Sequence, residues 1–320
     1  MRTFNNDVDD LTRAFSHCHS LRFHRVNELL MIEVINASAK ASIALQGAQI
    51  SYYQPIHQRP ILWCSDLCDY RQNSPLRGGI PICWPWFGNL SANPDAITAQ
   101  YSAAQIDDAS AHGFARLAQW QLIEVDERDD QTALLMRLVI AANSRADWPF
   151  ACQLDYRIDI GRELRIEFIV TNLDSRRFHY SSALHSYFSV SHIANIRLSG
   201  LDQSRYCDTL DDWQEKQQRG DIVVDSEVDR IYYPVANGDN ALTLKIQDSQ
   251  HGNIAIASDH SASCVVWNPW IDKAKRLSQF HHNDYQKMLC IETAHCGDDF
   301  ISLAPGQKQR LNLTLVTCHD

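Results

Sequence analysis

Residues 153–170 read QLDYRIDIGRELRIEFIV, and polar and apolar side chains alternate along both halves of this segment. Alternation with a period of two places every second side chain on the same face of a β-strand. Gly161 and Arg162 interrupt the pattern and are typical of a turn between two strands. The segment therefore predicts a β-hairpin with one buried face.

Similar runs extend this prediction over most of the chain. Strands are expected at 134–141, 242–246, 264–267 and 311–316, with two more inside 32–45, whereas helical patterns are short and fall at 7–15 and 283–287. Many strands, few helices and no linker rich in Pro, Gly or Ser predict an all-β fold, a large antiparallel β-sandwich or barrel. We expect residues 1–20 to be an N-terminal extension that carries the first helix, and residues 21–320 to be a single domain.

Composition and charge exclude several classes of protein. The chain has 320 residues, of which 29 are basic and 39 acidic, so its formal net charge is −10. An acidic balance disfavours a nucleic-acid partner, which usually requires a basic stripe. The sequence contains no run of about 18 apolar residues, the length that a membrane-spanning helix needs. The N-terminal segment MRTFNNDVDDLTRAF lacks the apolar centre of a signal peptide. We therefore expect a cytoplasmic protein without a nucleic-acid or membrane partner.

The ten cysteines are expected to be reduced thiols. Cys64 and Cys68 are spaced C-x3-C, and Cys290 and Cys296 lie on either side of His295. Structural zinc sites usually combine two closely spaced pairs, a pattern that this chain lacks. Most of the cysteines lie in apolar stretches, where cysteine packs as a small hydrophobic side chain. We predict no metal site.

Two glycine-containing segments carry cationic side chains. Residues 75–88 read PLRGGIPICWPWFG, and the Gly-Gly pair beside Arg77 would let a ligand approach the backbone closely. Residues 111–116 read AHGFAR, in which His112 can donate to a sugar hydroxyl or a phosphate, and Arg116 can bind an anion through two donors. Tight turns with Arg77 and Arg116 on the surface, and His112 as a hydrogen-bonded loop residue, remain the structural alternative.

Two further segments place a titratable side chain among apolar neighbours. His185 lies in SALHSYFSV, residues 182–190, where it is either a hydrogen-bonded core residue or a proton-transfer group. Glu292 lies in MLCIETA, residues 288–294. A carboxylate inside an apolar strand is costly unless it is paired, and burial would raise its pKa and make it a better base. Glu292 is therefore the strongest acidic candidate.

The last two segments contain candidates for sugar contacts. Asp229 in DRIY, residues 229–232, can accept hydrogen bonds from hydroxyl groups, or it can be a turn residue or the partner of Arg230. Trp267 in WNPW, residues 267–270, offers a flat ring for stacking on a sugar, or it belongs to the core beside a rigid turn. Lys273 and Lys275 follow, and their charge would suit an anionic substrate.

Together these segments resemble the aldose 1-epimerase (mutarotase) superfamily, and within it the hexose-6-phosphate branch, the YeaD-like glucose-6-phosphate 1-epimerases. They occur in the family's order, and each is a weak signal alone. The six segments are RGGIP (77–81), HGFAR (112–116), LHSYF (184–188), VDRIY (228–232), VWNPW (266–270) and CIE (290–292). The chain departs from the family pattern at Ala111, a position that is often Gln in the family, and this departure bears on sugar specificity.

The resemblance implies a galactose mutarotase-like β-sandwich, a single domain, and no metal or organic cofactor. It implies that His185 is the catalytic acid and Glu292 the catalytic base, and that Arg77, Arg116 and Asp229 contact the substrate. It is compatible with a monomer, which we expect. The predicted partner is a small-molecule sugar phosphate, and glucose 6-phosphate is the predicted substrate of an epimerase that interconverts α and β anomers.

The chemistry of anomerisation requires an acid and a base together. The O1 hydroxyl loses a proton while the ring oxygen O5 gains one, the ring opens, the C1–C2 bond rotates, and the ring closes on the other face. His185 must then start protonated, and we expect a neighbouring negative charge to raise its pKa. The alternatives are a mutarotase for free aldoses, a non-catalytic sugar-binding module, and a glycoside hydrolase that pairs Glu292 with Asp229.

Overall fold

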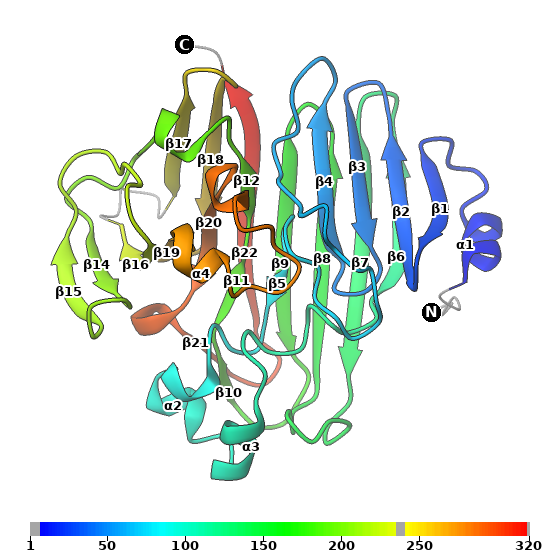
Figure 1. The fold of residues 1–320 in the computed structure, drawn as a ribbon. Helices are drawn as coiled ribbons and strands as arrows, with labels where there is room; N and C mark the ends of the chain where they lie inside the picture. The colour runs from blue at the N-terminus through cyan, green and yellow to red at the C-terminus, as the bar shows by residue number, and fades with distance from the viewer. Residues whose placement is uncertain (1–6, 235–240, 319–320) are drawn as a thin grey trace.

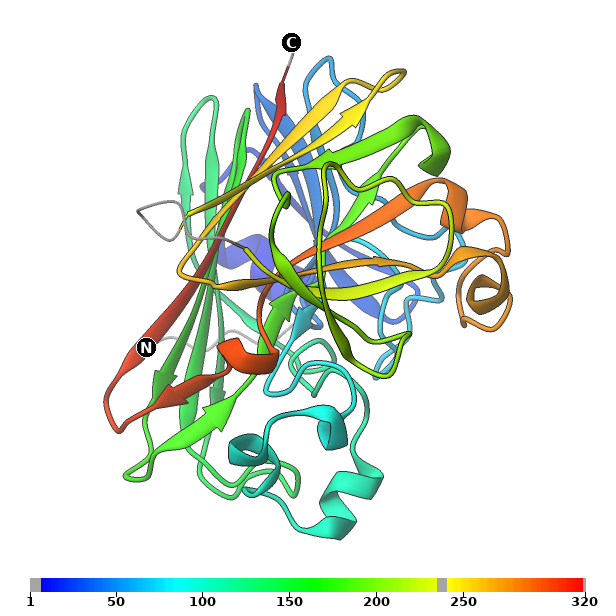
Figure 2. The same ribbon diagram turned by 90° about the vertical axis from the view of Figure 1, so that its left-hand side faces the viewer.

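The computed structural model of the chain describes residues 7–234 and 241–318. Within these residues the strands form two eight-stranded sheets, one four-stranded sheet and one two-stranded sheet, and the hydrogen-bonded strand pairs are antiparallel. Figure 1 shows the sheets, and Figure 2 shows one eight-stranded sheet as a layer that faces the others. The all-β sandwich predicted from the alternating runs is confirmed.

The first eight-stranded sheet, named here the long sheet, contains the hairpin predicted at 153–170. The hairpin consists of β8 (Cys152–Ile160) and β9 (Leu164–Asn172), and Ile160 pairs with Leu164 across the turn. Leu154, Tyr156 and Ile158 are buried on one face of β8, while Arg157 between them is exposed. The strand order is β13 (Ile196–Ser199), β17 (Leu242–Asp248), β18 (Asn253–Asp259), β22 (Lys308–Cys318), β9 (Leu164–Asn172), β8 (Cys152–Ile160), β7 (Thr132–Ile140) and β6 (Gln121–Glu127).

The second eight-stranded sheet is named here the cleft sheet. Its strands come from distant parts of the sequence, and β12 (Tyr187–Ser189) pairs with β20 beside β11. The strand order is β15 (Gln214–Gln217), β14 (Arg205–Asp208), β16 (Val228–Tyr233), β19 (Ser263–Asn268), β20 (Met288–His295), β11 (Ser182–Leu184) and β5 (Ile82–Cys83). The predicted strands at 242–246, 264–267 and 311–316 are therefore present as β17, β19 and β22.

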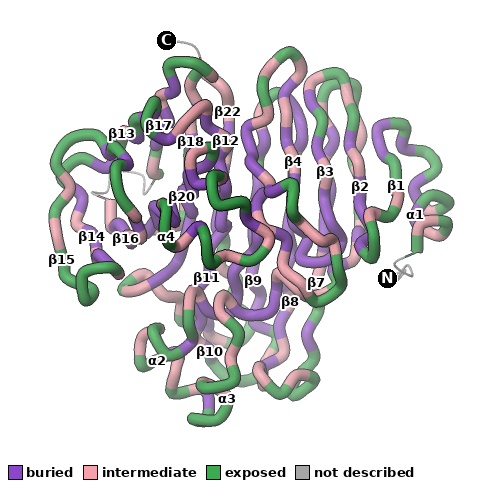
Figure 3. The backbone as a smooth tube through the Cα atoms, viewed as in Figure 1, coloured by how far each residue is buried: buried purple, intermediate pink, exposed green. Residues whose placement is uncertain are grey.

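The four-stranded sheet follows the chain in order. It consists of β1 (Leu21–Val26), β2 (Leu29–Ile35), β3 (Ala39–Ala44) and β4 (Gln49–Pro55), so the two strands expected inside 32–45 are β2 and β3. The two-stranded sheet pairs β10 (Phe178–Tyr180) with β21 (Ile301–Leu303). Figure 3 shows that the middles of the strands are buried and that the connecting loops are exposed.

Helices are short throughout the described residues. The helix expected at 7–15 is α1, capped by the Asp7 side chain, and its Leu11 packs in the main core. The segment expected to be helical at 283–287 is a single 3-10 turn. None of the helices in the described ranges is long and apolar enough to cross a membrane. The helices are α1 (Val8–Ala14), α2 (Asp95–Thr98), α3 (Ala103–Asp108), α4 (Trp270–Ala274), η1 (Leu90–Ala92), η2 (Ile193–Asn195), η3 (Asp284–Gln286) and η4 (Gly297–Asp299).

One hydrophobic core joins the three larger sheets. Ile43 of β3, Tyr156 of β8 and Val266 of β19 belong to the same buried cluster. Because side chains alternate across a strand, the neighbours of Val266 point to the opposite face of the cleft sheet. Val265 on that face belongs to a separate, smaller cluster. The cleft sheet therefore covers the core with one face and presents the other face for a binding site.

Candidate active site

A cleft of about 350 Å³ opens on the free face of the cleft sheet. This volume lies within the range of small-molecule sites, about 300–1,000 Å³. Six of the seven predicted site residues line it, namely Arg77, His112, His185, Asp229, Trp267 and Glu292. The structure therefore brings together side chains that are separated by up to 215 positions in the sequence, Arg77 to Glu292 (292 − 77).

The strand register explains how these side chains meet. Residues directly opposite in an antiparallel pair point to the same face of a sheet. Asp229 of β16 lies opposite Trp267 of β19, and Trp267 lies opposite Cys290 of β20. Glu292 is two residues beyond Cys290, so its side chain points to the same face. Asp229 and Trp267, the candidates for sugar contact, are thus neighbours across two strands. The Glu292 carboxyl group lies on the same face, two residues further along β20.

His185 and Glu292 form a buried pair at the base of the cleft. The His185 Nε2 atom lies 3.3 Å from Glu292 Oε1, and their side chains are only 11% and 2% exposed. The other polar atoms of the pair, His185 Nδ1 and Glu292 Oε2, are buried without a hydrogen-bond partner in the protein. Unpaired buried polar atoms are costly, and they are expected where a ligand completes the hydrogen bonding.

The environment of the pair shifts both pKa values in opposite directions. Burial raises the pKa of Glu292 well above 4.5, and the negative charge of Asp229 raises it further. Burial lowers the pKa of His185 to about 3, and the positive charges of Arg116 and Arg77 act in the same direction. The expectation that burial raises the pKa of Glu292 is confirmed. The expectation that a negative neighbour raises the pKa of His185 is wrong, because the charges that act on it are two arginines.

Two aromatic rings and the backbone fix the orientation of His185. It follows β11, and its backbone N–H donates to the carbonyl oxygen of Pro81 at 3.0 Å. The Tyr187 ring stacks on the imidazole with a centroid distance of 4.8 Å and an angle of 11°. The Trp267 ring packs edge-on at 6.0 Å. Sequence reasoning did not single out Tyr187 as a site residue, although it belongs to the LHSYF segment.

Arg77 is held in the wall of the cleft by its neighbours. Its Nε atom donates to the carbonyl oxygen of Ser278 at 3.4 Å, and its guanidinium also hydrogen bonds to Tyr187. Gly79 follows with a φ of 65°, and a Cβ atom there would lie 2.0 Å from the carbonyl oxygen of Ile50. Only glycine permits this close approach of the two chain segments. The close approach at Gly79 is therefore to another segment of the chain, whereas the approach of a ligand was expected there.

His112 is a neutral hydrogen-bond donor at the edge of the cleft. Its Nδ1 atom accepts a hydrogen bond from the Gly88 backbone N–H at 3.2 Å, so Nε2 carries the ring proton. Burial and the charge of Arg116 lower its pKa well below 6.5. Its ring lies 5.6 Å from that of His185. His112 therefore presents an N–H group beside the catalytic candidates.

Arg116 is the one predicted site residue that is not among those lining the cleft. Its Nη2 atom donates to the backbone carbonyl of Ala111 at 2.7 Å. Its charge still reaches the site, since it lowers the pKa values of both His112 and His185. The structure thus places Arg116 close enough to act on both histidines through its charge, and direct contact with a substrate stays a prediction.

Asp229 lines the cleft beside a lysine. Lys273 of α4 lies 3.5 Å from Asp229 Oδ2 and 3.2 Å from Glu227 Oε1. The same ammonium group lies 5.8 Å from the centre of the Trp267 ring. Burial raises the pKa of Asp229, and Lys273 opposes this effect. Lys273, which the sequence left as one of two cationic candidates, is therefore already paired with carboxylates.

The cleft also contains Trp213, a side chain that no sequence pattern selected. Trp213 lines it from the turn between β14 and β15 and is 49% exposed. An exposed indole at a polar cleft offers a surface for stacking. No period or motif in the sequence marks this residue, because its position depends on how the β14–β15 hairpin folds over the sheet.

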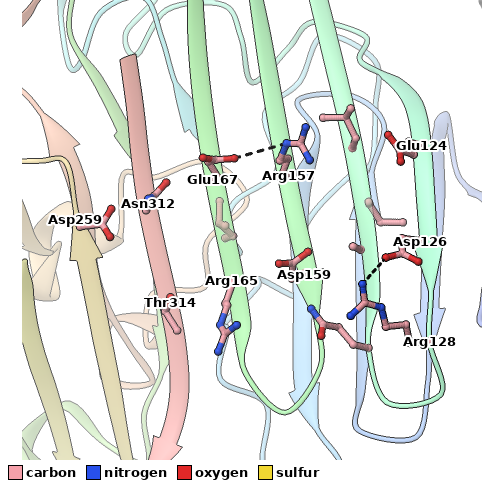
Figure 4. Close-up of a pocket in the computed structure, with 15 residues that line it drawn as sticks. Glu124, Asp126, Arg128, Arg157, Asp159, Arg165, Glu167, Asp259, Asn312 and Thr314 are labelled. Carbon is pink, nitrogen blue, oxygen red and sulfur yellow. Dashed lines mark hydrogen bonds and ion pairs between the residues drawn. The ribbon is translucent and has the colours of Figure 1, made fainter. Parts of the chain in front are cut away.

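A second hollow of about 650 Å³ lies on the exposed face of the long sheet. Figure 4 shows its side chains, which are mostly charged and project from neighbouring strands. Several are paired with one another, including Arg157 with Glu167 at 3.6 Å and Arg128 with Asp126 at 3.0 Å. None of the predicted site residues lines it. We therefore assign the candidate active site to the cleft.

Comparison with known proteins agrees with this geometry. The model of the family described as Aldose 1-epimerase matches residues 31–315. The chain belongs to the aldose 1-epimerase family. A Salmonella typhimurium protein named "Putative glucose-6-phosphate 1-epimerase" is 30% identical over 289 residues, which is 90% of this chain and 88% of that protein.

Two solved structures extend the comparison to the fold. A crystal structure described as "a putative mutarotase (YeaD)" from Salmonella typhimurium matches with a TM-score of 0.83 and 28% identity, over 97% of this chain and 99% of that one. A "galactose mutarotase-like protein" from Clostridium acetobutylicum matches with a TM-score of 0.72 and 16% identity, over 94% and 98% of the two chains. The predicted galactose mutarotase-like fold is confirmed.

The cysteines give no indication of a metal centre in the residues described. Within 7–234 and 241–318 no group of three or more His, Cys, Asp or Glu side chains is placed to hold a metal ion. The ten cysteines are free thiols, and Cys290 and Cys296 are buried in the cleft sheet. The expectation of no metal and no cofactor stays a prediction.

Proposed function

We propose that this aldose 1-epimerase family member interconverts the α and β anomers of hexose 6-phosphates, with glucose 6-phosphate as its substrate. The observation that carries the proposal is the buried His185–Glu292 pair, 3.3 Å apart in a cleft that Arg77 also lines. A site that only bound sugar would have no need of an acid and a base whose free atoms face a ligand. The names of the relatives point to the same substrate class.

In the proposed mechanism the pair carries one proton. One group protonates O5 while the other accepts the proton of O1, so the pyranose ring opens and the roles have been exchanged. Rotation about C1–C2 and the reverse transfers close the ring on the other face. Each such transfer typically contributes about 10²–10⁴-fold to the rate. Because both transfers occur within the pair, its total proton count is the same before and after a turnover.

The environment decides where that proton starts. Burial and Asp229 favour protonated Glu292, and burial together with the arginines favours neutral His185. In the free enzyme we therefore place the proton on Glu292, which makes it the initial acid and His185 the initial base. This is the reverse of the assignment that the family resemblance implies. A coupled pair titrates as a unit, so the observed pKa values belong to both residues.

The phosphate group accounts for the cationic wall of the cleft. A hexose phosphate carries two negative charges near neutral pH, and an arginine binds phosphate through two parallel donors. Arg77 faces the cleft, and the N–H of His112 offers a neutral donor nearby. Asp229 and Trp267 are proposed to contact the sugar, by hydrogen bonding and by stacking. Arg116 supports the site through its charge.

The cellular setting is proposed on composition alone. The net charge of −10 and the ten free cysteines favour a cytoplasmic protein that does not bind nucleic acid or membranes. We propose that it acts as a monomer on a small-molecule substrate. We propose residues 21–320 as a single domain, which the shared core of the three larger sheets supports, with Leu11 and Phe15 of the N-terminal extension packed into that core.

The test is anomeric exchange of glucose 6-phosphate, followed by two-dimensional exchange NMR at neutral pH. We expect the wild-type protein to accelerate exchange and His185→Ala to abolish the acceleration. His260→Ala, which changes an exposed histidine outside the cleft, is the matched control. Equal activity on free glucose would favour the mutarotase for free aldoses. No exchange with any hexose or hexose phosphate by folded protein would favour the sugar-binding module.

A further inference from the structure

Two cysteines lie directly behind the arginine of the cleft. Cys64 and Cys68 belong to the loop between β4 and β5, and their Sγ atoms are 3.8 Å apart. A turn brings them together, since the Cys68 N–H donates to the carbonyl oxygen of Ser65 at 3.2 Å. Both are partly exposed free thiols, whereas Cys83, Cys290 and other cysteines of the cleft sheet are buried. The two sulfurs are thus adjacent, and both belong to residues that are partly exposed.

The same sulfurs hold the backbone of Arg77. Its carbonyl oxygen lies 3.6 Å from the sulfur of Cys64 and 3.5 Å from that of Cys68, within hydrogen-bond reach of both thiols. Its N–H donates to the Cys68 sulfur at 3.3 Å. The contact is close along the backbone too, because a Cβ atom on Gly78 would lie 2.4 Å from Cys64 Cα. Movement of the cysteine loop must therefore move Arg77.

We propose that Cys64 and Cys68 form an oxidation site, at which a peroxide converts the two thiols to a disulfide, and that this disulfide weakens binding of the substrate phosphate by displacing Arg77. The inference about Arg77 rests on the proposed function. The disulfide requires the sulfurs to approach from 3.8 Å to about 2.05 Å, a movement within reach of a surface loop.

The reaction balances with hydrogen peroxide as the oxidant. The Cys68 thiolate attacks one peroxide oxygen, the O–O bond breaks, and the hydroxide released takes up a proton, which leaves Cys68 as a sulfenic acid. The Cys64 sulfur then attacks the Cys68 sulfur. The S–S bond forms, the S–O bond breaks, and the departing hydroxide takes the Cys64 proton. Two thiols and one peroxide give one disulfide and two waters.

Hydrogen bonds, burial and the charge of Arg77 decide which of the two cysteines attacks the peroxide. Hydrogen bonds from Cys64 and from the Arg77 backbone lower the pKa of Cys68, and the charge of Arg77 acts in the same direction. The hydrogen bond to Cys68 and burial raise the pKa of Cys64. A thiolate is the nucleophile in thiol oxidation, so Cys68 is the residue that attacks and Cys64 the residue that resolves.

Oxidation leaves neither sulfur with a hydrogen to donate to the Arg77 carbonyl, which then keeps the Ser65 N–H at 2.9 Å as its remaining backbone donor. We expect the KM for glucose 6-phosphate to rise by about tenfold, the factor that corresponds to losing one hydrogen bond to a charged group. The kcat value should change less, because His185 and Glu292 are held by other elements. Cys64 and Cys68 are therefore positioning residues that act through Arg77.

The experiment treats the full-length protein with hydrogen peroxide and measures two quantities. Peptide mass spectrometry without reduction should find the 64–68 segment lighter by two hydrogens, and exchange NMR should show the raised KM. Dithiothreitol should reverse both changes. Cys64→Ser should show neither change when its treated and untreated samples are compared. Cys207→Ser, which removes another partly exposed thiol on β14, should respond as the wild type does.

Two results would overturn the inference. One is peroxide treatment that oxidises other cysteines while Cys64 and Cys68 remain thiols. The other is a disulfide that forms between them and leaves KM unchanged. A reduced protein without epimerase activity would instead refute the proposed function. The mass of the 64–68 segment would then decide the oxidation site by itself, and failure of the disulfide to form would overturn it.

Discussion

Replacing Glu292 with Gln exchanges one carboxyl oxygen for an amide NH2 group. The side chain keeps nearly the same shape but can no longer gain or lose a proton. The carboxyl group is 2% exposed and lies 3.3 Å from His185, so the amide of glutamine would occupy the same place but could not carry the proton. We expect kcat for anomeric exchange of glucose 6-phosphate to fall by about 10²–10⁴-fold, or about 3–5 kcal/mol in activation free energy. Exchange NMR over a series of enzyme concentrations separates this rate from spontaneous anomerisation.

The stability of the same variant tests the environment of the carboxyl group. The pKa of Glu292 is raised above 4.5 in the folded protein, so the wild type loses stability as pH rises through that raised value. Glutamine does not ionise, so Glu292→Gln should gain stability relative to the wild type as pH rises. Denaturant unfolding at several pH values measures this difference. Lower relative stability of the variant at alkaline pH would contradict the assigned protonation.

The control for this prediction is Glu167→Gln on the long sheet. Glu167 pairs with Arg157 and Arg310 on the exposed face and lies outside the cleft. Its replacement should leave kcat and KM unchanged. Retention of kcat within about threefold by Glu292→Gln would refute the role of the His185–Glu292 pair, because one proton-transfer group contributes at least about 10²-fold.

Three further predictions follow from the same geometry. Arg77→Ala should raise the KM for glucose 6-phosphate by about tenfold or more, with a smaller change in kcat. Arg157→Ala on the long sheet is its control, and an unchanged KM would exclude Arg77 from phosphate binding. The value of kcat/KM should fall as pH rises, when Glu292 loses the proton of the pair, whereas His185 stays neutral down to about pH 3. A kcat/KM value that keeps rising through alkaline pH would contradict this. Gly113→Ala should lower the free energy of unfolding by about 1–3 kcal/mol, because φ is 66° and a Cβ atom would lie 2.1 Å from the Trp84 carbonyl oxygen. Gly220 has the same φ but no atom within 4 Å of the added Cβ, so Gly220→Ala measures the backbone strain without the clash. Equal losses of unfolding free energy in the two variants, measured by denaturant unfolding, would refute the clash.

The fold was largely predictable because its information is local. Alternation in 153–170 depends only on which side chains of each strand face the core, and the hairpin β8–β9 forms with that face buried. The same reasoning located β17, β19 and β22 from their own residues. Strand order is not local. No pattern in the sequence places β5, β11 and β20 side by side, because these pairings depend on how the sheets close over a common core.

The site shows the same division between sequence and structure. Segment composition and the family resemblance selected six of the residues that line the cleft. Composition did not exclude Arg116, whose guanidinium turns to the Ala111 carbonyl. Nor did it include Trp213, which reaches the cleft through the fold of the β14–β15 turn. Side-chain direction in a loop depends on packing partners that are distant in the sequence.

The order of residues specifies which chemical groups this protein possesses, the alternation that makes its strands, and the glycines that allow close approach of the backbone. The protonation of those groups depends on how the chain packs. His185 was expected to be charged, but burial and two arginines lower its pKa, while burial and Asp229 raise that of Glu292. A pKa value depends on solvent exclusion and on charges within a few ångströms, and both are set when segments far apart in the chain pack together.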